Sequence, residues 1–133
     1  MSESTGWRTP RSLGRDEGSV HNLGVDFVIK VSELTSGAGA SVAEYVTRKG
    51  EEPHDHVHQY EDEMFYVVEG KVAFRCAGSR FEVDRGGLVF LPQGVPHGYD
   101  IISDGDVRLL VITAPRRDQA GGWGGFLGDV EHR

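Results

Sequence analysis

The chain has 133 residues, a length that fits one domain with a core of its own. Its 14 basic and 21 acidic residues give a formal charge of −7, so no basic patch is available for a nucleic-acid backbone or an anionic membrane. No apolar run approaches the ~20 residues that span a bilayer. From the charge and the lack of such a run together, we expect neither nucleic acid nor a membrane as a partner, and a small molecule as the substrate.

The cellular compartment is indicated by what the chain lacks. Cys76 is the single cysteine, which excludes an internal disulfide and is compatible with a reducing compartment. The first residues contain no apolar core of a signal peptide. We therefore expect a cytoplasmic protein.

The first third of the chain contains a polar arm and two strand patterns. Residues 1–19 are polar without a sustained period, which predicts a flexible N-terminal arm. Apolar residues alternate over 25–31, which predicts a strand, and a Gly/Ser/Ala turn follows at 35–40. Residues 41–47 form a second β-prone run.

The rest of the chain repeats one pattern, a short strand ended by Gly, Pro or Asp. The predicted strands cover 64–68, 71–76, 80–83, 88–91, 97–101 and 107–113. No segment of ten or more residues shows the 3.6-residue period of a helix. Residues 20–115 are therefore predicted to form one all-β sandwich or barrel.

The C-terminal tail, residues 116–133, combines glycines with two large aromatic residues, Trp123 and Phe126. One interpretation is a disordered end. The alternative is a lid, because glycine hinges beside aromatic side chains suit a mobile cover that excludes water.

The stretch from Gly50 to Gly70 carries the strongest chemical signal. It contains three histidines at period two, His54, His56 and His58, followed by carboxylates that include Glu63. Alternate residues of a strand face one side, so two imidazoles would converge, and a turn could bring Glu63 beside them. Nitrogen and carboxylate oxygen donors suit a divalent transition metal and leave positions open for a substrate.

Two motifs resemble those of the cupin superfamily. The first motif is matched in spacing by Gly50, His56, His58, Glu63 and Gly70. The second is matched by Gly86, Pro92, Gly94 and His97, with Ile101 where the family has asparagine. The run around the first motif is also similar to small single-barrel cupins related to quercetin dioxygenase.

This resemblance implies a double-stranded β-helix, the jelly-roll or cupin barrel. It also implies one metal ion held by His56, His58, Glu63 and His97. Three imidazoles and a carboxylate accept Fe, Mn, Ni, Co, Cu or Zn, so the identity of the metal stays open. Without a cation, four buried polar groups would have to be satisfied by hydrogen bonds alone.

The expected substrate pocket lies around these ligands. Its candidate residues are His54, Phe65, Phe74, Tyr99, Trp123 and Phe126. Tyr99 shares a face with His97 and is either a core residue or a pocket wall, and Phe65 and Phe74 are either core or apolar lining. Glu61 and Asp62 are predicted to lie in a solvated turn. The alternative is that one of them accepts a hydrogen bond from a ligand histidine.

The resemblance favours a metal-dependent dioxygenase acting on an aromatic, flavonoid-like or polyketide-like molecule, with Glu63 as the catalytic general base. The alternatives are a non-oxidative isomerase, cyclase or decarboxylase using the same metal, and a cupin that binds a small molecule without turnover. The apolar set Met64, Tyr66 and Val68 on the outer face of a predicted strand is consistent with a homodimer.

Overall fold

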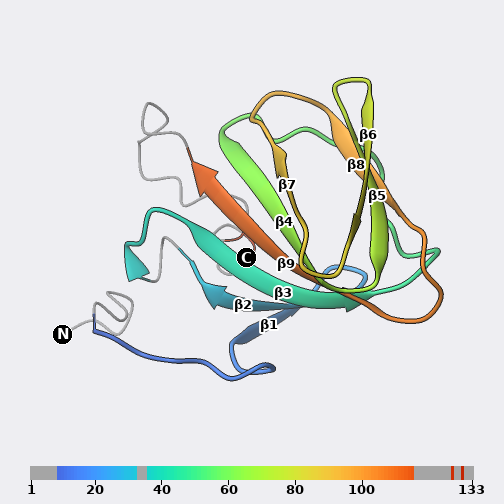
Figure 1. Cartoon of the computed structure of the whole chain (residues 1–133). Coiled ribbons are helices and arrows are strands. Elements are labelled where there is room, and N and C mark those ends of the chain that lie inside the picture. The colour runs from blue at the N-terminus through green and yellow to red at the C-terminus, as the bar shows by residue number, and fades with distance from the viewer. Residues whose placement is uncertain (1–8, 33–35, 116–126, 128–129, 131–133) are drawn as a thin grey trace.

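The computed structural model describes residues 9–32 and 36–115, together with Leu127 and Val130. Nine strands are found among these residues (Figure 1). In chain order they are β1 (Ser19–Asn22), β2 (Asp26–Val31), β3 (Ser41–Thr47), β4 (Glu61–Glu69), β5 (Lys71–Cys76), β6 (Ser79–Asp84), β7 (Leu88–Leu91), β8 (His97–Ile101) and β9 (Val107–Pro115).

The strands form two antiparallel sheets. One has six strands in the order β1-β2-β3-β9-β4-β7, and the other has three in the order β6-β5-β8. The strand β4 lies between β9 and β7, whereas β5, β6 and β8 form a separate layer beside them (Figure 1). This architecture confirms the predicted all-β jelly-roll barrel. In the described part of the chain, no helix has the length and apolar character needed to cross a membrane.

The core follows from the period of two along each strand. In β3, Ala43 and Tyr45 are buried, while the alternating Glu44 and Val46 are half-buried on the outer face. The same alternation in β4 buries Glu63 and Phe65, so one inward row carries both a carboxylate and the core. Pattern and period therefore place the site chemistry inside the barrel.

The structure differs from the predicted strands mainly at two places. The strand β1 was not predicted, because its sequence, Ser-Val-His-Asn, has one apolar residue and pairs only with β2. The residues just before it are tied to β2, since the Lys30 ammonium donates to the carbonyls of Gly14, Arg15 and Glu17. The histidine-bearing stretch is not a strand: from 51 to 60 only His56 makes a β-bridge.

Candidate metal centre

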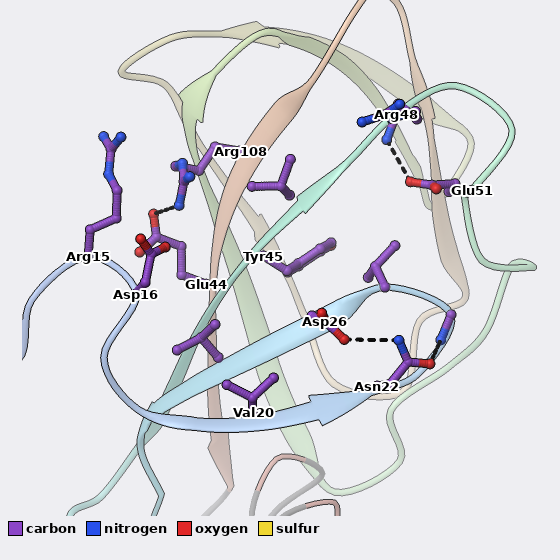
Figure 2. A pocket seen from close by; sticks show the side chains of 14 residues that line it. Arg15, Asp16, Val20, Asn22, Asp26, Glu44, Tyr45, Arg48, Glu51 and Arg108 are labelled. Atoms are coloured by element: carbon purple, nitrogen blue, oxygen red, sulfur yellow. Dashed lines mark hydrogen bonds and ion pairs between the residues drawn. The ribbon is translucent and has the colours of Figure 1, made fainter.

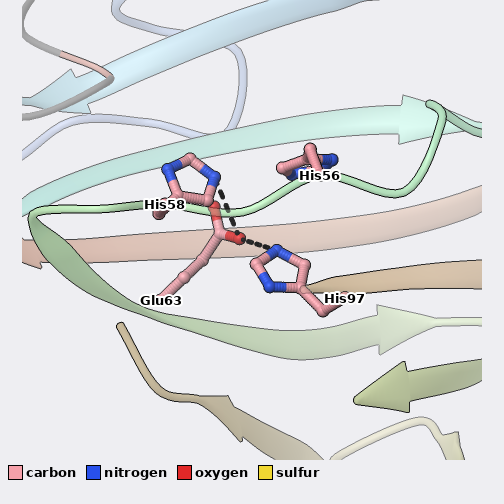
Figure 3. Close-up of side chains that lie close together, drawn as sticks. All are labelled: His56, His58, Glu63 and His97. Carbon is pink, nitrogen blue, oxygen red and sulfur yellow. Dashed lines mark ion pairs between the residues drawn. The ribbon is translucent and has the colours of Figure 1, made fainter. Parts of the chain in front are cut away.

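Four side chains from two separate stretches of the sequence converge inside the barrel. His56, His58, Glu63 and His97 each offer a ligand atom, and these atoms all lie within 4.8 Å of one another. His56 and His58 come from the loop before β4, Glu63 from β4 itself, and His97 from the start of β8 (Figure 3). Glu63 and His97 are buried, and His56 is the most exposed of the four.

Backbone hydrogen bonds bring the histidines together where no regular strand does. The amide of His56 donates to the carbonyl of His97 over 3.0 Å, and the amide of His97 donates back over 2.9 Å. The amide of Gly94 donates to the carbonyl of His58 over 2.8 Å. The loop before β8 and the loop before β4 are therefore joined directly at the site.

All three imidazoles use Nδ1 for a hydrogen bond within the protein. His56 Nδ1 donates to the carbonyl of His54 over 2.9 Å, and His97 Nδ1 donates to the carbonyl of Val95 over 3.3 Å. His58 Nδ1 lies 2.9 Å from Glu61 Oε1. A carbonyl or carboxylate partner requires a proton on Nδ1, which leaves the Nε2 lone pair for a metal.

The donor set fits a divalent transition metal. Glu63 Oε1 and His97 Nε2 lie 2.9 Å apart, yet both are buried atoms without a hydrogen-bond partner among the described residues. Glu63 Oε1 also lies 3.5 Å from His58 Nε2 (Figure 3). Buried polar atoms without a partner are costly, and lone pairs facing one another repel unless a cation lies between them. The cluster could hold one metal ion, whose identity the four ligands do not decide.

Glu61 was expected more readily in a solvated turn, and the structure places it in the interior instead. Its side chain is fully buried, and its Oε1 contacts His58 Nδ1. Burial alone disfavours the charged form of His58, but the Glu61 hydrogen bond and the charges of Glu63 and Glu61 outweigh it and raise the pKa of His58. The alternative, that this carboxylate contacts a ligand histidine, describes the observed contact.

A cavity of about 470 Å³ adjoins the cluster. His56, His58 and Glu63 contribute polar atoms to its wall. Most of the remaining wall is apolar, formed by Leu23, Val25, Phe27, Phe65, Val111 and Leu127 among others. A largely apolar cavity of this size with a few convergent polar groups is typical of small-molecule sites.

A pair of tyrosines lines the same cavity. The hydroxyls of Tyr45 and Tyr99 lie 2.9 Å apart in the interior. Burial raises the pKa of Tyr99 to about 12, and burial and the neighbouring Tyr99 raise that of Tyr45 well above its usual value. Both phenols are therefore protonated near pH 7. One hydroxyl proton forms the hydrogen bond between the two tyrosines, and the other hydroxyl proton is left to donate to a ligand.

The structure assigns the predicted pocket residues to different places. Phe65 and Tyr99 line the cavity. His54 is exposed and not part of the lining, because the loop lacks the strand geometry on which its prediction depended. Phe74 is fully buried, with its ring centroid 5.3 Å from that of Phe65, behind the cavity wall.

Trp123 and Phe126, the proposed lid residues, lie outside the described residues. The tail nevertheless reaches the cavity at Leu127, which is fully buried and part of its wall. Sequence reasoning missed Leu127 because it considered only the aromatic residues of the tail. It also missed Tyr45, whose position in an alternating strand was the available signal.

A second cavity, of about 520 Å³, lies on the outer side of β3 (Figure 2). Most of its charged side chains are engaged with one another or with neighbours. Arg108 donates to Glu44 over 3.0 Å, and Asn22 donates to Asp26 over 2.9 Å (Figure 2). Arg48, also on its wall, donates to Asp106 over 2.6 Å. These contacts make the second cavity a structural network, in contrast to the unpartnered atoms of the first.

The fold and the site together define a small β-barrel protein with a candidate metal centre in its interior. Comparison with known families gives the same class, because residues 43–113, more than half of the chain, match the cupin domain family. The chain therefore belongs to the cupin family. The comparisons do not support the narrower expectation that the chain resembles quercetin dioxygenase in particular.

Similar proteins support the family without fixing an activity. An uncharacterized protein of Streptomyces coelicolor is 31% identical over 83 residues, which cover 62% of this chain and 73% of that protein. The polyketide synthase CurC of Streptomyces cyaneus is 27% identical over 70 residues, 53% of this chain but only 46% of CurC. Among solved structures, KdgF from a Halomonas species has a TM-score of 0.65 at 20% identity, covering 80% of this chain and 95% of KdgF.

Proposed function

We propose that the protein is a metal-dependent enzyme acting on a small aromatic or polyketide-like molecule, and that its reaction is a dioxygenation. The observation that carries the proposal is the position of the cluster, with His56, His58 and Glu63 facing a largely apolar cavity. The name of CurC as a polyketide synthase supports the same substrate class.

A bound divalent metal would act as a Lewis acid that stabilises an enolate or catecholate oxygen of the substrate. Glu63 accepts the proton that the substrate loses, because its carboxylate belongs to the cavity wall and can shift between the metal and the substrate. The Tyr45–Tyr99 pair donates a hydrogen bond to a second substrate oxygen. The apolar wall, including Phe65 and Val111, holds the carbon skeleton and excludes water.

The dioxygenase and its non-oxidative alternatives differ in their need for oxygen. The test incubates protein loaded separately with Fe, Mn, Ni, Co, Cu or Zn with catechols, flavonols and 1,3-diketones, in air and under anaerobic conditions. We expect product only in air, with one dioxygen consumed per turnover. Equal conversion without oxygen would establish an isomerase, cyclase or decarboxylase on the same residues. Tight ligand binding without conversion by any metal form would establish a binding protein.

We also propose that the protein forms a homodimer through the outer face of β4 and β7. There Tyr66 pairs with Leu88 and Met64 with Phe90 across the two strands. Leu88 and Phe90 are each more than half exposed, and Tyr66 is 37% exposed. Val68, the third residue of the predicted set, is half-buried. A contiguous apolar patch of this kind on a folded surface marks a contact with another protein.

Phe90→Glu is expected to convert the dimer to a monomer, because a charge in the centre of an apolar contact must be desolvated without a partner. Light scattering after gel filtration measures the mass. The matched control is Phe81→Glu on β6, an exposed phenylalanine in the other sheet. A monomeric wild-type protein, or equal effects of both substitutions, would exclude this interface.

A further inference from the structure

A charge contact outside the cavity joins the histidine-bearing loop to the three-stranded sheet. Asp55 lies between His54 and His56, and both of its carboxylate oxygens accept from Arg75 Nη1, over 2.9 and 2.7 Å. Arg75 belongs to β5, where it pairs with Gly98 of β8. The same guanidinium donates from Nε to Asp100 over 3.1 Å. Arg75 thus connects the loop at Asp55 to β8 at Asp100.

Gly98 leaves the space in which the Asp55 carboxylate lies. A Cβ atom at this buried position would clash with Oδ1 of Asp55 and lie 2.7 Å from its Cγ. It would also lie 3.0 Å from Arg75 Nη2. Gly98 is not among the glycines with positive φ, so its backbone does not require glycine. The close approach of the Asp55 carboxylate is the reason for a glycine beside His97.

His56 depends on this contact more than the other members of the cluster do. It is the most exposed of the four, and its loop belongs to no strand. Its backbone is held by the two hydrogen bonds to His97. Among the described residues its ring makes one hydrogen bond, to the carbonyl of His54, besides edge contacts with the rings of His58 and His97. The residue between His54 and His56 is Asp55, so the Arg75 contact fixes the segment that orients the imidazole.

We propose that Asp55 is a positioning residue that holds His56 in the geometry required for metal binding. Its ion pair with Arg75 and the absence of a side chain at Gly98 fix the Asp55 carboxylate in place. The inference rests on the metal centre but not on which reaction the centre supports. Its effect is moderate, because the Asp55 and Arg75 side chains are 54% and 38% exposed and an exposed charge pair contributes little.

The first test measures Co²⁺ affinity by calorimetric titration of the metal-free protein. Asp55→Asn is expected to raise the Kd about two- to fivefold, the range that corresponds to an exposed pair. The matched control is Asp100→Asn, because Asp100 contacts the same guanidinium and is similarly exposed but is not on the loop. We expect its Kd to stay within about twofold of wild type. Equal effects of both substitutions would overturn the proposal.

Arg75→Gln separates positioning from simple charge attraction. Removing a positive charge near a cation site should by electrostatics alone tighten Co²⁺ binding. Loss of the ion pair with Asp55 should instead weaken Co²⁺ binding, to about the affinity of Asp55→Asn. Tighter binding by Arg75→Gln would overturn the proposal.

Gly98→Ala tests the steric part of the argument. Alone, it should displace the Asp55 carboxylate and weaken Co²⁺ binding as Asp55→Asn does. Combined with Asp55→Ala, it should add no further loss, because no carboxylate remains to be displaced. A loss by Gly98→Ala that persists in the Asp55→Ala background would show that it acts directly on His97, and would overturn this assignment.

Amide hydrogen exchange of the metal-free protein gives a readout that does not depend on metal binding or activity. The bridge amides of His56 and His97 should exchange about two- to fivefold faster in Asp55→Asn than in Asp100→Asn. If exchange is faster in Asp55→Asn but the wild-type protein binds no metal, the role of Asp55 in holding the loop would stand and the metal centre would be excluded. Unchanged exchange would exclude the contact itself as a determinant of the loop.

Discussion

Replacing His97 with alanine is expected to lower the affinity for a divalent metal by more than about a hundredfold, since loss of even a residue behind the ligands costs 10–100-fold. His97 Nε2 is buried, has no hydrogen-bond partner in the part of the chain that the structure describes, and lies 2.9 Å from Glu63 Oε1. Without this nitrogen the cluster retains two imidazoles and one carboxylate. Calorimetric titration with Co²⁺ or Zn²⁺, and elemental analysis of the purified variant, measure the loss.

The matched control for His97→Ala is His54→Ala, which removes an exposed histidine two residues from His56 whose side chain does not line the cavity. Its carbonyl, which accepts from His56 Nδ1, belongs to the backbone and is retained. We expect metal affinity close to wild type. Because His97 is buried, His97→Gln, which keeps most of the volume, and thermal melts of each metal-free variant separate ligand loss from unfolding. Full metal content in His97→Ala and His97→Gln would exclude the proposed centre.

The sequence was sufficient for most of the barrel because each strand carries its own local signal. The runs 41–47, 71–76, 88–91 and 97–101 were predicted at the bounds that the structure has. The start of β4 was missed by three residues, because Glu61 and Asp62 look like solvent-exposed polar residues in sequence. Glu61 is buried and Asp62 half-buried because they pair with Pro115 and Ala114 of β9, which is a long-range contact that no local pattern reveals.

The convergence of the site was predicted by reasoning that holds only in part. Period-two spacing was expected to aim His56 and His58 together, but their loop is not a strand. Their rings approach because the His56–His97 bridge and the Gly94 hydrogen bond fix the backbone. The resemblance to a family supplied His97, 34 residues after Glu63. The place of Leu127 in the cavity wall depended on tertiary packing that only the folded chain shows, whereas Tyr45 had a local signal in the alternation of its strand.

Glu61→Gln is expected to lower metal affinity by about 10–100-fold, although Glu61 itself is not among the four clustered residues. Its fully buried carboxylate lies 2.9 Å from His58 Nδ1. A carboxylate in this position fixes the proton on Nδ1, orients the ring and makes Nε2 a stronger donor to a metal. Glutamine keeps the shape and one acceptor oxygen but removes the charge, so the change tests the electrostatic contribution. Co²⁺ titration of the metal-free variant measures the effect.

The matched control for Glu61→Gln is Glu69→Gln, at the other end of β4, where the carboxylate is 57% exposed. The two substitutions remove the same charge from the same strand, and only Glu61 contacts a histidine of the cluster. Equal Co²⁺ affinities of the two variants would show that net charge, and not the His58 contact, governs binding. A large loss confined to Glu61→Gln would instead show that the carboxylate expected in a solvated turn acts through His58 on the metal.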